Sequence, residues 1–131
     1  MSPGAGNAAS THDRGLMAEE RAAGYLREKG YSVLERNFRT REGEIDIIAL
    51  GSTRSENDTI VFVEVKSLPH GSTDTLSHEL NSTKQQKILK TAKCYLQKHR
   101  QYNDSYIRFD VIALDVPALD PVHHIVNAFS E

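Results

Sequence analysis

Cysteine and tryptophan are scarce in this sequence: Cys94 is its single thiol, and no tryptophan occurs among the 131 residues. One cysteine excludes an intrachain disulfide framework. Residues 1–14 lack the apolar core of a signal peptide, and no apolar run approaches the roughly 20 residues that cross a bilayer. We therefore expect a protein of the reducing cytoplasm with no membrane segment.

An excess of charge of one sign is also missing. Sixteen Lys and Arg residues stand against 18 Asp and Glu residues, the formal net charge is −2, and 38% of the residues are hydrophobic. This composition is that of an ordinary globular protein and does not by itself indicate a nucleic-acid-binding one. The length suits one domain with a modest core. We expect a disordered tail of small and polar residues at positions 1–13 and a single domain over residues 14–131, active alone or as a homodimer.

Sequence periodicity predicts both helices and strands. Apolar residues recur three and four positions apart in two segments, which predicts helices over residues 15–29 and 84–100. Apolar segments rich in β-branched residues predict strands over residues 31–38, 44–50, 60–66, 106–114 and 123–129. Polar residues predict a hairpin loop at 51–59 and a long loop at 67–83, with a short helical turn near residues 76–80. This order indicates an α/β three-layer sandwich with a mixed central β-sheet flanked by helices.

Three acidic residues and a lysine interrupt two of the predicted strands. Glu44 and Asp46 lie in an isoleucine-rich segment, and Glu64 and Lys66 end a run of apolar residues. Side chains two positions apart share a face of a strand, so the charges converge if the two faces align. A cross-strand ion pair, contributing at most about 1 kcal/mol, is the alternative interpretation. It explains opposite charges better than it explains three carboxylates facing one lysine.

This pattern suits a metal-dependent phosphodiesterase site. Magnesium, or manganese, prefers oxygen ligands, which Asp46, Glu64 and the carbonyl of Val65 would supply. The metal would activate a water molecule, and Lys66 would hold or deprotonate that water or neutralise the transition state. Glu19, in the first predicted helix, falls on the arc that faces the core. It either completes the site or lies at the edge of that arc and pairs with an arginine.

Positive charge is concentrated locally. Arg36 and Arg39 precede the acidic strand and are our preferred phosphate contacts, together with Lys84 and Lys87 at the start of the second long helix. A solvated surface is the alternative for most lysines of that helix. Arg108 either pairs with Asp110 on the same strand face or supports the site, if its strand adjoins that of Glu64.

Short motifs follow one another in a fixed order between residues 14 and 115. They are Gly15-x-x-Ala18-Glu19-x-x-Ala22, Tyr25-Leu26, Gly30-Tyr31, Arg36-Asn37-x-Arg39, Gly43-Glu44-Ile45-Asp46-Ile47-Ile48-Ala49, Phe62-Val63-Glu64-Val65-Lys66 and Arg108-Phe109-Asp110-Val111. These motifs resemble the YraN-like family of small bacterial proteins. That family is similar to the PD-(D/E)xK restriction-endonuclease-like superfamily and, within it, to archaeal Holliday-junction resolvases.

The resemblance implies a restriction-endonuclease-like fold and a magnesium-dependent nuclease. It implies catalytic roles for Asp46, Glu64 and Lys66, with Glu19 as the first-helix acid. Glu44, at the start of its strand, is left with a supporting role. The family often has an arginine two residues after the motif lysine, and here Leu68 stands there. We expect a DNA endonuclease selective for branched or repair intermediates. A module that binds nucleic acid or a partner without cutting, and a scaffold that binds a structural ion, are the alternatives.

Overall fold

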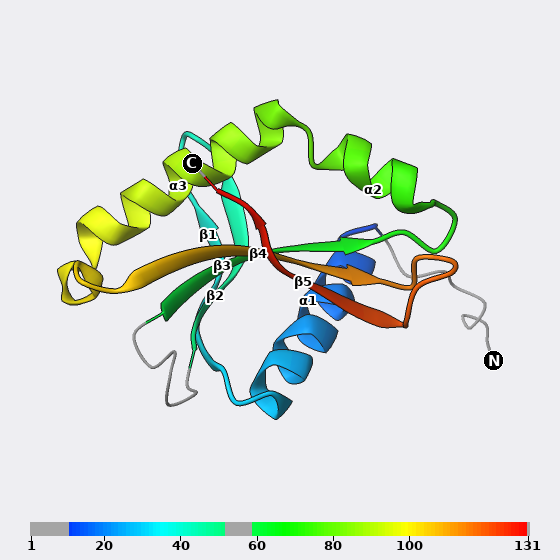
Figure 1. Cartoon of the computed structure of the whole chain (residues 1–131), viewed down its shortest axis with the longest axis horizontal. Coiled ribbons are helices and arrows are strands. Elements are labelled where there is room, and N and C mark those ends of the chain that lie inside the picture. The colour runs from blue at the N-terminus through cyan, green and yellow to red at the C-terminus, as the bar shows by residue number, and fades with distance from the viewer. Residues whose placement is uncertain (1–10, 52–58, 131) are drawn as a thin grey trace.

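The computed structural model describes residues 11–51 and 59–130 (Figure 1). The helices in these ranges are α1 (Thr11–Glu28), α2 (Thr73–Glu79), α3 (Ser82–Lys98) and the short 3-10 helix η1 (Arg100–Tyr102). The strands are β1 (Ser32–Arg39), β2 (Glu44–Leu50), β3 (Thr59–Ser67), β4 (Tyr106–Leu114) and β5 (Val122–Phe129). No helix in the described ranges is both long and apolar enough to cross a membrane.

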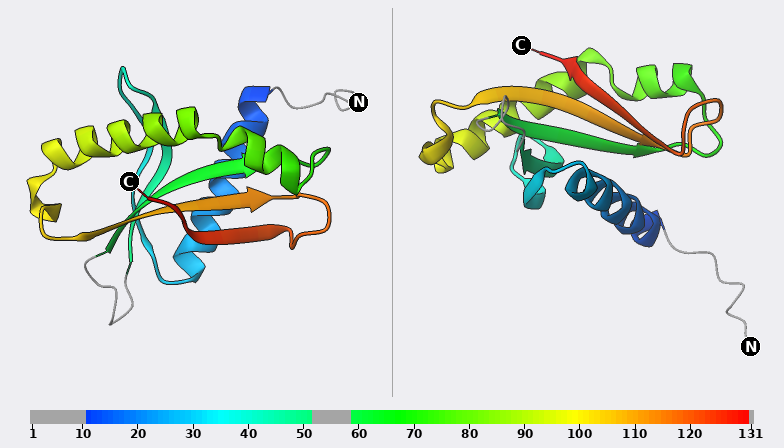
Figure 2. Two further views of the ribbon diagram at one scale, coloured as in Figure 1. Left: turned by 45° about the horizontal axis from the view of Figure 1, so that its top comes forward. Right: turned by 60° about the horizontal axis from the view of Figure 1, so that its bottom comes forward.

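The strands form one sheet in the order β1-β2-β3-β4-β5. β3 and β4 are parallel, and the other neighbouring pairs are antiparallel. A parallel pair needs a crossover, which α2 and α3 provide. Figure 2 shows α1 on one face of the sheet and α2 and α3 on the other. The predicted three-layer α/β sandwich with a mixed sheet is therefore confirmed.

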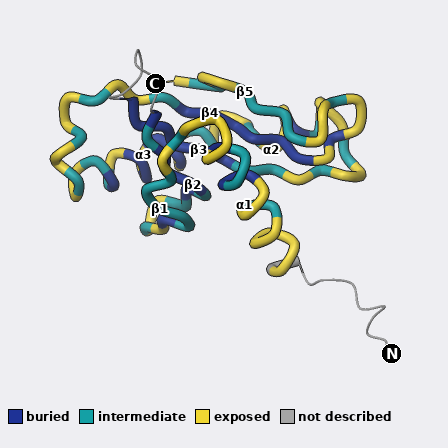
Figure 3. The backbone as a smooth tube through the Cα atoms, turned by 90° about the horizontal axis from the view of Figure 1, so that it is seen from below, coloured by how far each residue is buried: buried dark blue, intermediate teal, exposed yellow. Residues whose placement is uncertain are grey.

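Each face of the sheet has its own apolar core. On one face, Ala22 and Leu26 of α1, four residues apart, pack against Ile47 and Val61. On the other, Ile88, Leu89 and Tyr95 of α3 pack against side chains that include Phe38 and Phe62. β3 and β4 are buried along most of their length, as Figure 3 shows, because both faces are covered. A charged residue on either strand therefore needs a partner.

The boundaries of several elements differ from the sequence prediction. α1 begins at Thr11 rather than residue 15, and α3 begins at Ser82 rather than residue 84. The expected loop at 67–83 contains a seven-residue helix, α2, which begins with a reciprocal capping box between Ser72 and Thr75. Residues 1–10 of the expected tail and residues 52–58 of the expected hairpin loop lie outside the described residues.

A buried carboxylate joins β4 to β5. Asp110 is fully buried and accepts hydrogen bonds from Arg108 Nε at 2.9 Å, from the Asn127 amide at 2.9 Å and from His124 Nε2 at 2.7 Å. Burial alone would raise the pKa of Asp110, but the hydrogen bonds from His124 and Arg108 outweigh it and hold that pKa below its ordinary value. This cluster stabilises the outer part of the sheet.

Replacement of Asp110 tests that role. Asp110→Ala leaves Arg108 buried without its carboxylate, and we expect it to lower the free energy of unfolding by about 3 kcal/mol or more. The exposed Asp120 provides a control, since Asp120→Ala should change stability by less than about 0.5 kcal/mol. Urea denaturation at pH 7 measures both values. Equal stability of the two variants would contradict a structural role for the cluster.

Candidate functional site at the fork of β2 and β3

β2 and β3 separate at the position of the predicted site. They pair from Leu50 and Ile60 to Ile47 and Val63, whereas β3 stays paired with β4 as far as Ser67. The next position on β2 is Asp46, whose Oδ2 accepts a hydrogen bond of 2.8 Å from the backbone amide of Val65. A hydrogen bond from a side chain thus replaces the backbone pairing of the two strands at this point. Beyond it the strands separate, and we call this place the fork. Figure 2 shows β3 running on toward α2 while the β1–β2 hairpin turns away.

Two lysines and two glutamates alternate in a series of contacts at this fork. Glu64 is buried, and its Oε2 lies 3.5 Å from Lys66 Nζ and 3.4 Å from Lys84 Nζ. Lys66 Nζ also lies 3.2 Å from Oε1 of Glu79, the last residue of α2. We call Glu79, Lys66, Glu64 and Lys84 the ion-pair chain. It brings β3, α2 and α3 together.

Glu19 approaches the fork from the opposite side. Its side chain is 12% exposed, and its buried Oε1 makes no hydrogen bond, with Arg36 Nη2 at 3.8 Å. Burial raises the pKa of Glu19, although hydrogen bonding from Asn37 and the charge of Arg36 oppose the shift. Both interpretations of Glu19 thus hold in part, because it faces the site and also lies near an arginine.

Asp46 lies between the two other carboxylates. Burial, followed by the charge of Glu64, raises the pKa of Asp46 to about 8, and the Val65 amide opposes the shift. Glu19 raises the pKa further. The three carboxylates therefore influence one another at the fork. The sequence predicted that Asp46 and Glu64 converge if the faces of their strands align, and the register aligns them, because Ile48 of β2 is paired with Phe62 of β3 and both pack in the core beneath α3.

A recess of about 420 Å³ opens beside Asp46 between α1 and the segment that joins β3 to α2. Glu19, Asp46, Val65, Lys66 and Glu79 line it. Four of the predicted site residues therefore meet in one cavity. Glu64 is not among its lining residues and contacts Lys66 from the α3 side.

The donor set fits a hard cation with few protein ligands. In residues 11–51 and 59–130, no group of three or more His, Cys, Asp or Glu side chains is placed to hold a metal ion. Magnesium needs only one or two carboxylates and keeps several waters. Asp46 and Glu64 meet that requirement. A cation would also favour the ionised form of Asp46, whose pKa is raised by burial and then by the charge of Glu64, and would give the buried Glu19 Oε1 a closer partner than Arg36, directly or through water.

Most of the predicted phosphate contacts have carboxylate partners. Arg36 Nη1 lies 2.8 Å from Glu20, and Arg39 Nε donates to Glu44 at 2.7 Å. Lys84 binds Glu64 as part of the ion-pair chain. Lys87 is exposed near the start of α3. Phosphate binding would therefore require three of these four cations to share or exchange a carboxylate.

Arg108 lies apart from the fork. Its strand does adjoin β3, but Arg108 is level with Val61 and donates to Asp110 and to the Tyr31 hydroxyl at 2.7 Å. Val61 packs toward α1, whereas Glu64 contacts α3. Of the two interpretations left open by the sequence, pairing with Asp110 is confirmed.

Two features of the structure escaped sequence reasoning. Glu79 was missed as a partner of Lys66, because the sequence predicted only a short helical turn near residues 76–80 and gave no sign of what that turn contacts. The contact of His124 with Asp110 and with the Tyr25 hydroxyl depends on long-range pairing of β4 with β5, which no local signal reveals.

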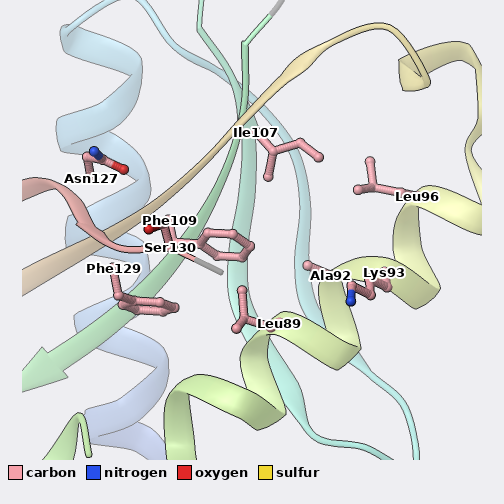
Figure 4. A pocket seen from close by; sticks show the side chains of 9 residues that line it. All are labelled: Leu89, Ala92, Lys93, Leu96, Ile107, Phe109, Asn127, Phe129 and Ser130. Atoms are coloured by element: carbon pink, nitrogen blue, oxygen red, sulfur yellow. The ribbon is translucent and has the colours of Figure 1, made fainter. Parts of the chain in front are cut away.

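A second pocket is apolar and separate from the fork. It has a volume of about 300 Å³ and lies between α3 and strands β4 and β5 (Figure 4). Leu89, Leu96, Ile107, Phe109 and Phe129 form most of its wall. It shares no lining residue with the recess and contains no acidic side chain. Its chemistry does not suit a phosphodiester.

The raised pKa of Asp46 predicts an unusual pH dependence of stability. The folded protein binds a proton at Asp46 that the unfolded chain loses between about pH 4 and pH 8, so this group makes stability decline as pH rises through that window. Asn keeps an acceptor for the Val65 amide but cannot ionise. Asp46→Asn should therefore raise Tm at pH 8 by about 5 °C or more, with a smaller gain at pH 5.

Thermal unfolding between pH 5 and pH 9, with EDTA present, measures this difference. The exposed Asp74 on α2 supplies the control, because Asp74→Asn makes the same chemical change away from the fork. A gain for Asp46→Asn that does not depend on pH would refute the raised pKa.

Comparison with known proteins places the chain in a family. The model of the uncharacterised protein family UPF0102 matches residues 18–114. A UPF0102 protein of Treponema denticola is 45% identical over 123 residues, which is 89% of this chain and 95% of the relative. Relatives from Alkaliphilus oremlandii and Persephonella marina are 43% and 42% identical, each over 88% of this chain and over 96% and 92% of their own lengths. The protein therefore belongs to the UPF0102 family, the YraN-like family that its motifs resemble.

Proposed function

We propose that this UPF0102 protein is a magnesium-dependent DNA endonuclease that acts on branched or repair intermediates. The observation that carries the proposal is the fork, where Asp46, Glu64, Lys66 and Glu19 meet although α1, β2 and β3 supply them separately. Burial and, after it, the charge of Glu64 raise the pKa of Asp46, so keeping these carboxylates together costs folding energy. A metal-binding function accounts for their retention at one place.

The side chains divide the work between metal and phosphate. Asp46 and Glu64 would hold Mg²⁺ or Mn²⁺, with the carbonyl of Val65 as a further candidate ligand. When bound, the ion supplies charge stabilisation and lowers the pKa of a water molecule. Glu19, whose buried Oε1 makes no hydrogen bond, is placed to accept one from water in the recess.

Lys66 would act as a cation rather than as a base. Burial lowers the pKa of Lys66, but Glu64 and Glu79 more than offset this and hold it above its ordinary value. The ammonium group therefore stays protonated at neutral pH. In that form Lys66 binds a phosphate oxygen and stabilises the negative charge that develops on it. Among the roles that the sequence left open, this is the one that the ion pairs favour.

Recognition would depend on phosphates and shape. Lys87 is exposed, and Arg36 and Arg39 form partly exposed ion pairs that phosphates can replace. No aromatic side chain lines the recess. Stacking on bases is therefore not available there, which favours recognition of DNA geometry over sequence.

A second function is favoured by one feature of the ion-pair chain. Glu64 Oε2 already has two ammonium groups within 3.5 Å, so its charge is balanced without a metal ion. The same two ammonium groups would suit a site that binds phosphates and no metal. The protein would then bind nucleic acid without cutting it. The two functions differ in whether phosphodiester bonds break when Mg²⁺ is added.

Cleavage of defined DNA substrates separates these functions. We expect metal-dependent cutting of a flap or four-way junction, measured on denaturing gels with Mg²⁺ or Mn²⁺ against single strands and plain duplex. Asp46→Ala and Lys66→Ala should each lower the rate by about 100-fold or more, because each removes a group that acts in the transition state.

Lys90→Ala provides the matched control. Lys90 is, like Lys87, an exposed lysine of α3. Its loss should change the rate by less than about threefold. Metal-dependent cutting that survives both Asp46→Ala and Lys66→Ala would overturn the assignment of the site. Salt-sensitive binding without cutting would support the second function.

Metal binding itself should depend on pH. A cation that binds Asp46 must displace its proton wherever pH lies below the pKa of about 8. Mn²⁺ affinity should therefore rise by up to about tenfold per pH unit from pH 6 to pH 8 and then level off. Isothermal titration calorimetry measures the affinity. The same affinity at pH 6 and pH 8 would show that Mn²⁺ does not bind Asp46.

A further inference from the structure

Glu79 is the acidic member of the ion-pair chain that the proposed reaction does not use. Its Oε1 lies 3.2 Å from Lys66 Nζ, and it lines the same recess as Asp46 and Lys66. A phosphate that approaches Lys66 through the recess therefore meets this carboxylate. Two anions brought to one ammonium group repel each other. Glu79 and a phosphate consequently compete for Lys66.

The position of Glu79 allows it to move. It is the last residue of the seven-residue helix α2, and its side chain is 43% exposed. Leu76 is the buried residue of α2 and packs on Val111, Ala113 and Val116, away from the ionic contact. An exposed ion pair contributes little to stability, so a change of rotamer can free Glu79 without disturbing that packing.

Lys84 at the other end of the ion-pair chain behaves differently. Its partner Glu64 is 5% exposed, and Asn81 caps the helix by accepting a hydrogen bond from the Lys84 amide at 3.0 Å. Removal of Lys84 from Glu64 would leave a buried carboxylate with one cation fewer. The weaker contact is therefore the one between Lys66 and Glu79.

We infer that Glu79 occupies the place of a substrate phosphate on Lys66, and that a phosphodiester must displace it to enter the site. The inference rests on the proposed function in that it takes the recess as the phosphodiester site. It makes Glu79 a specificity-determining residue. Only a ligand that brings a phosphate to Lys66 gains enough to replace the Glu79 carboxylate, and a ligand that binds other lysines or arginines leaves the contact between Glu79 and Lys66 in place.

Binding to DNA without metal tests this inference. The probe is a fluorescein-labelled four-way junction, and its affinity is measured by fluorescence anisotropy in EDTA at low salt. Glu79→Gln keeps the shape of the side chain and removes its charge, so it should tighten binding by about threefold to tenfold. Asp74→Asn removes one negative charge from an exposed position of the same helix and should change affinity by less than about twofold.

A double-mutant cycle shows whether Glu79 acts through Lys66. In a Lys66→Gln background, Glu79→Gln should change affinity by less than about twofold, because the ammonium group for which the two anions compete is gone. Three results would each overturn the inference. They are unchanged or weaker binding of Glu79→Gln, equal tightening by Asp74→Asn, and a gain that persists without Lys66.

The same experiment keeps this inference separate from the nuclease proposal. Binding in EDTA needs no cleavage, so a protein that cuts no DNA can still show the gain through Lys66. In that case Glu79 controls phosphate binding in a protein that binds nucleic acid without cutting it. If the protein cuts DNA but Glu79→Gln does not change binding, the nuclease proposal stands and the inference about Glu79 is wrong.

Discussion

The separation of β2 from β3 is the constraint on which the site depends. Backbone pairing ends at Ile47 and Val63, and the Asp46 side chain takes the Val65 amide in its place. Had the strands stayed paired, side chains at these positions would pack under α1 or α3, where an ionised carboxylate is very costly. The opened strands let solvent and a ligand reach the acids while β3 remains fixed to β4.

Opposite charges offset the cost of burying charged side chains at the fork. Glu64 is buried but has two lysines, and Lys66 has two glutamates, so the ion-pair chain is neutral overall. Asp46 and Glu19 lie outside this balance, and burial raises the pKa of both. Asp46 keeps the hydrogen bond from the Val65 amide, and Arg36 lies 3.8 Å from Glu19. Both carboxylates line the recess, which is where a cation is expected.

The sequence predicted the arrangement of the fold well, for identifiable reasons. Apolar periodicity marked both long helices and all five strands, since each packs against a core with a regular repeat. It also identified Asp46, Glu64 and Lys66, because charges in buried strands are conspicuous. Alternation along a strand predicted that the faces of Asp46 and Glu64 can align, which the pairing of Ile48 with Phe62 confirms, but it could not reveal the fork beyond that pairing. Contacts between distant segments, such as Glu79 with Lys66, depend on tertiary packing and stayed hidden.

We propose that the fork binds a divalent metal between Asp46 and Glu64. Anomalous scattering from crystals grown with Mn²⁺ tests this site, because the signal locates the ion without assuming any activity. We expect an anomalous peak beside Asp46 and Glu64 that disappears in crystals of Asp46→Ala. A structure at saturating Mn²⁺ with Asp46 and Glu64 ordered and no peak beside them would contradict it.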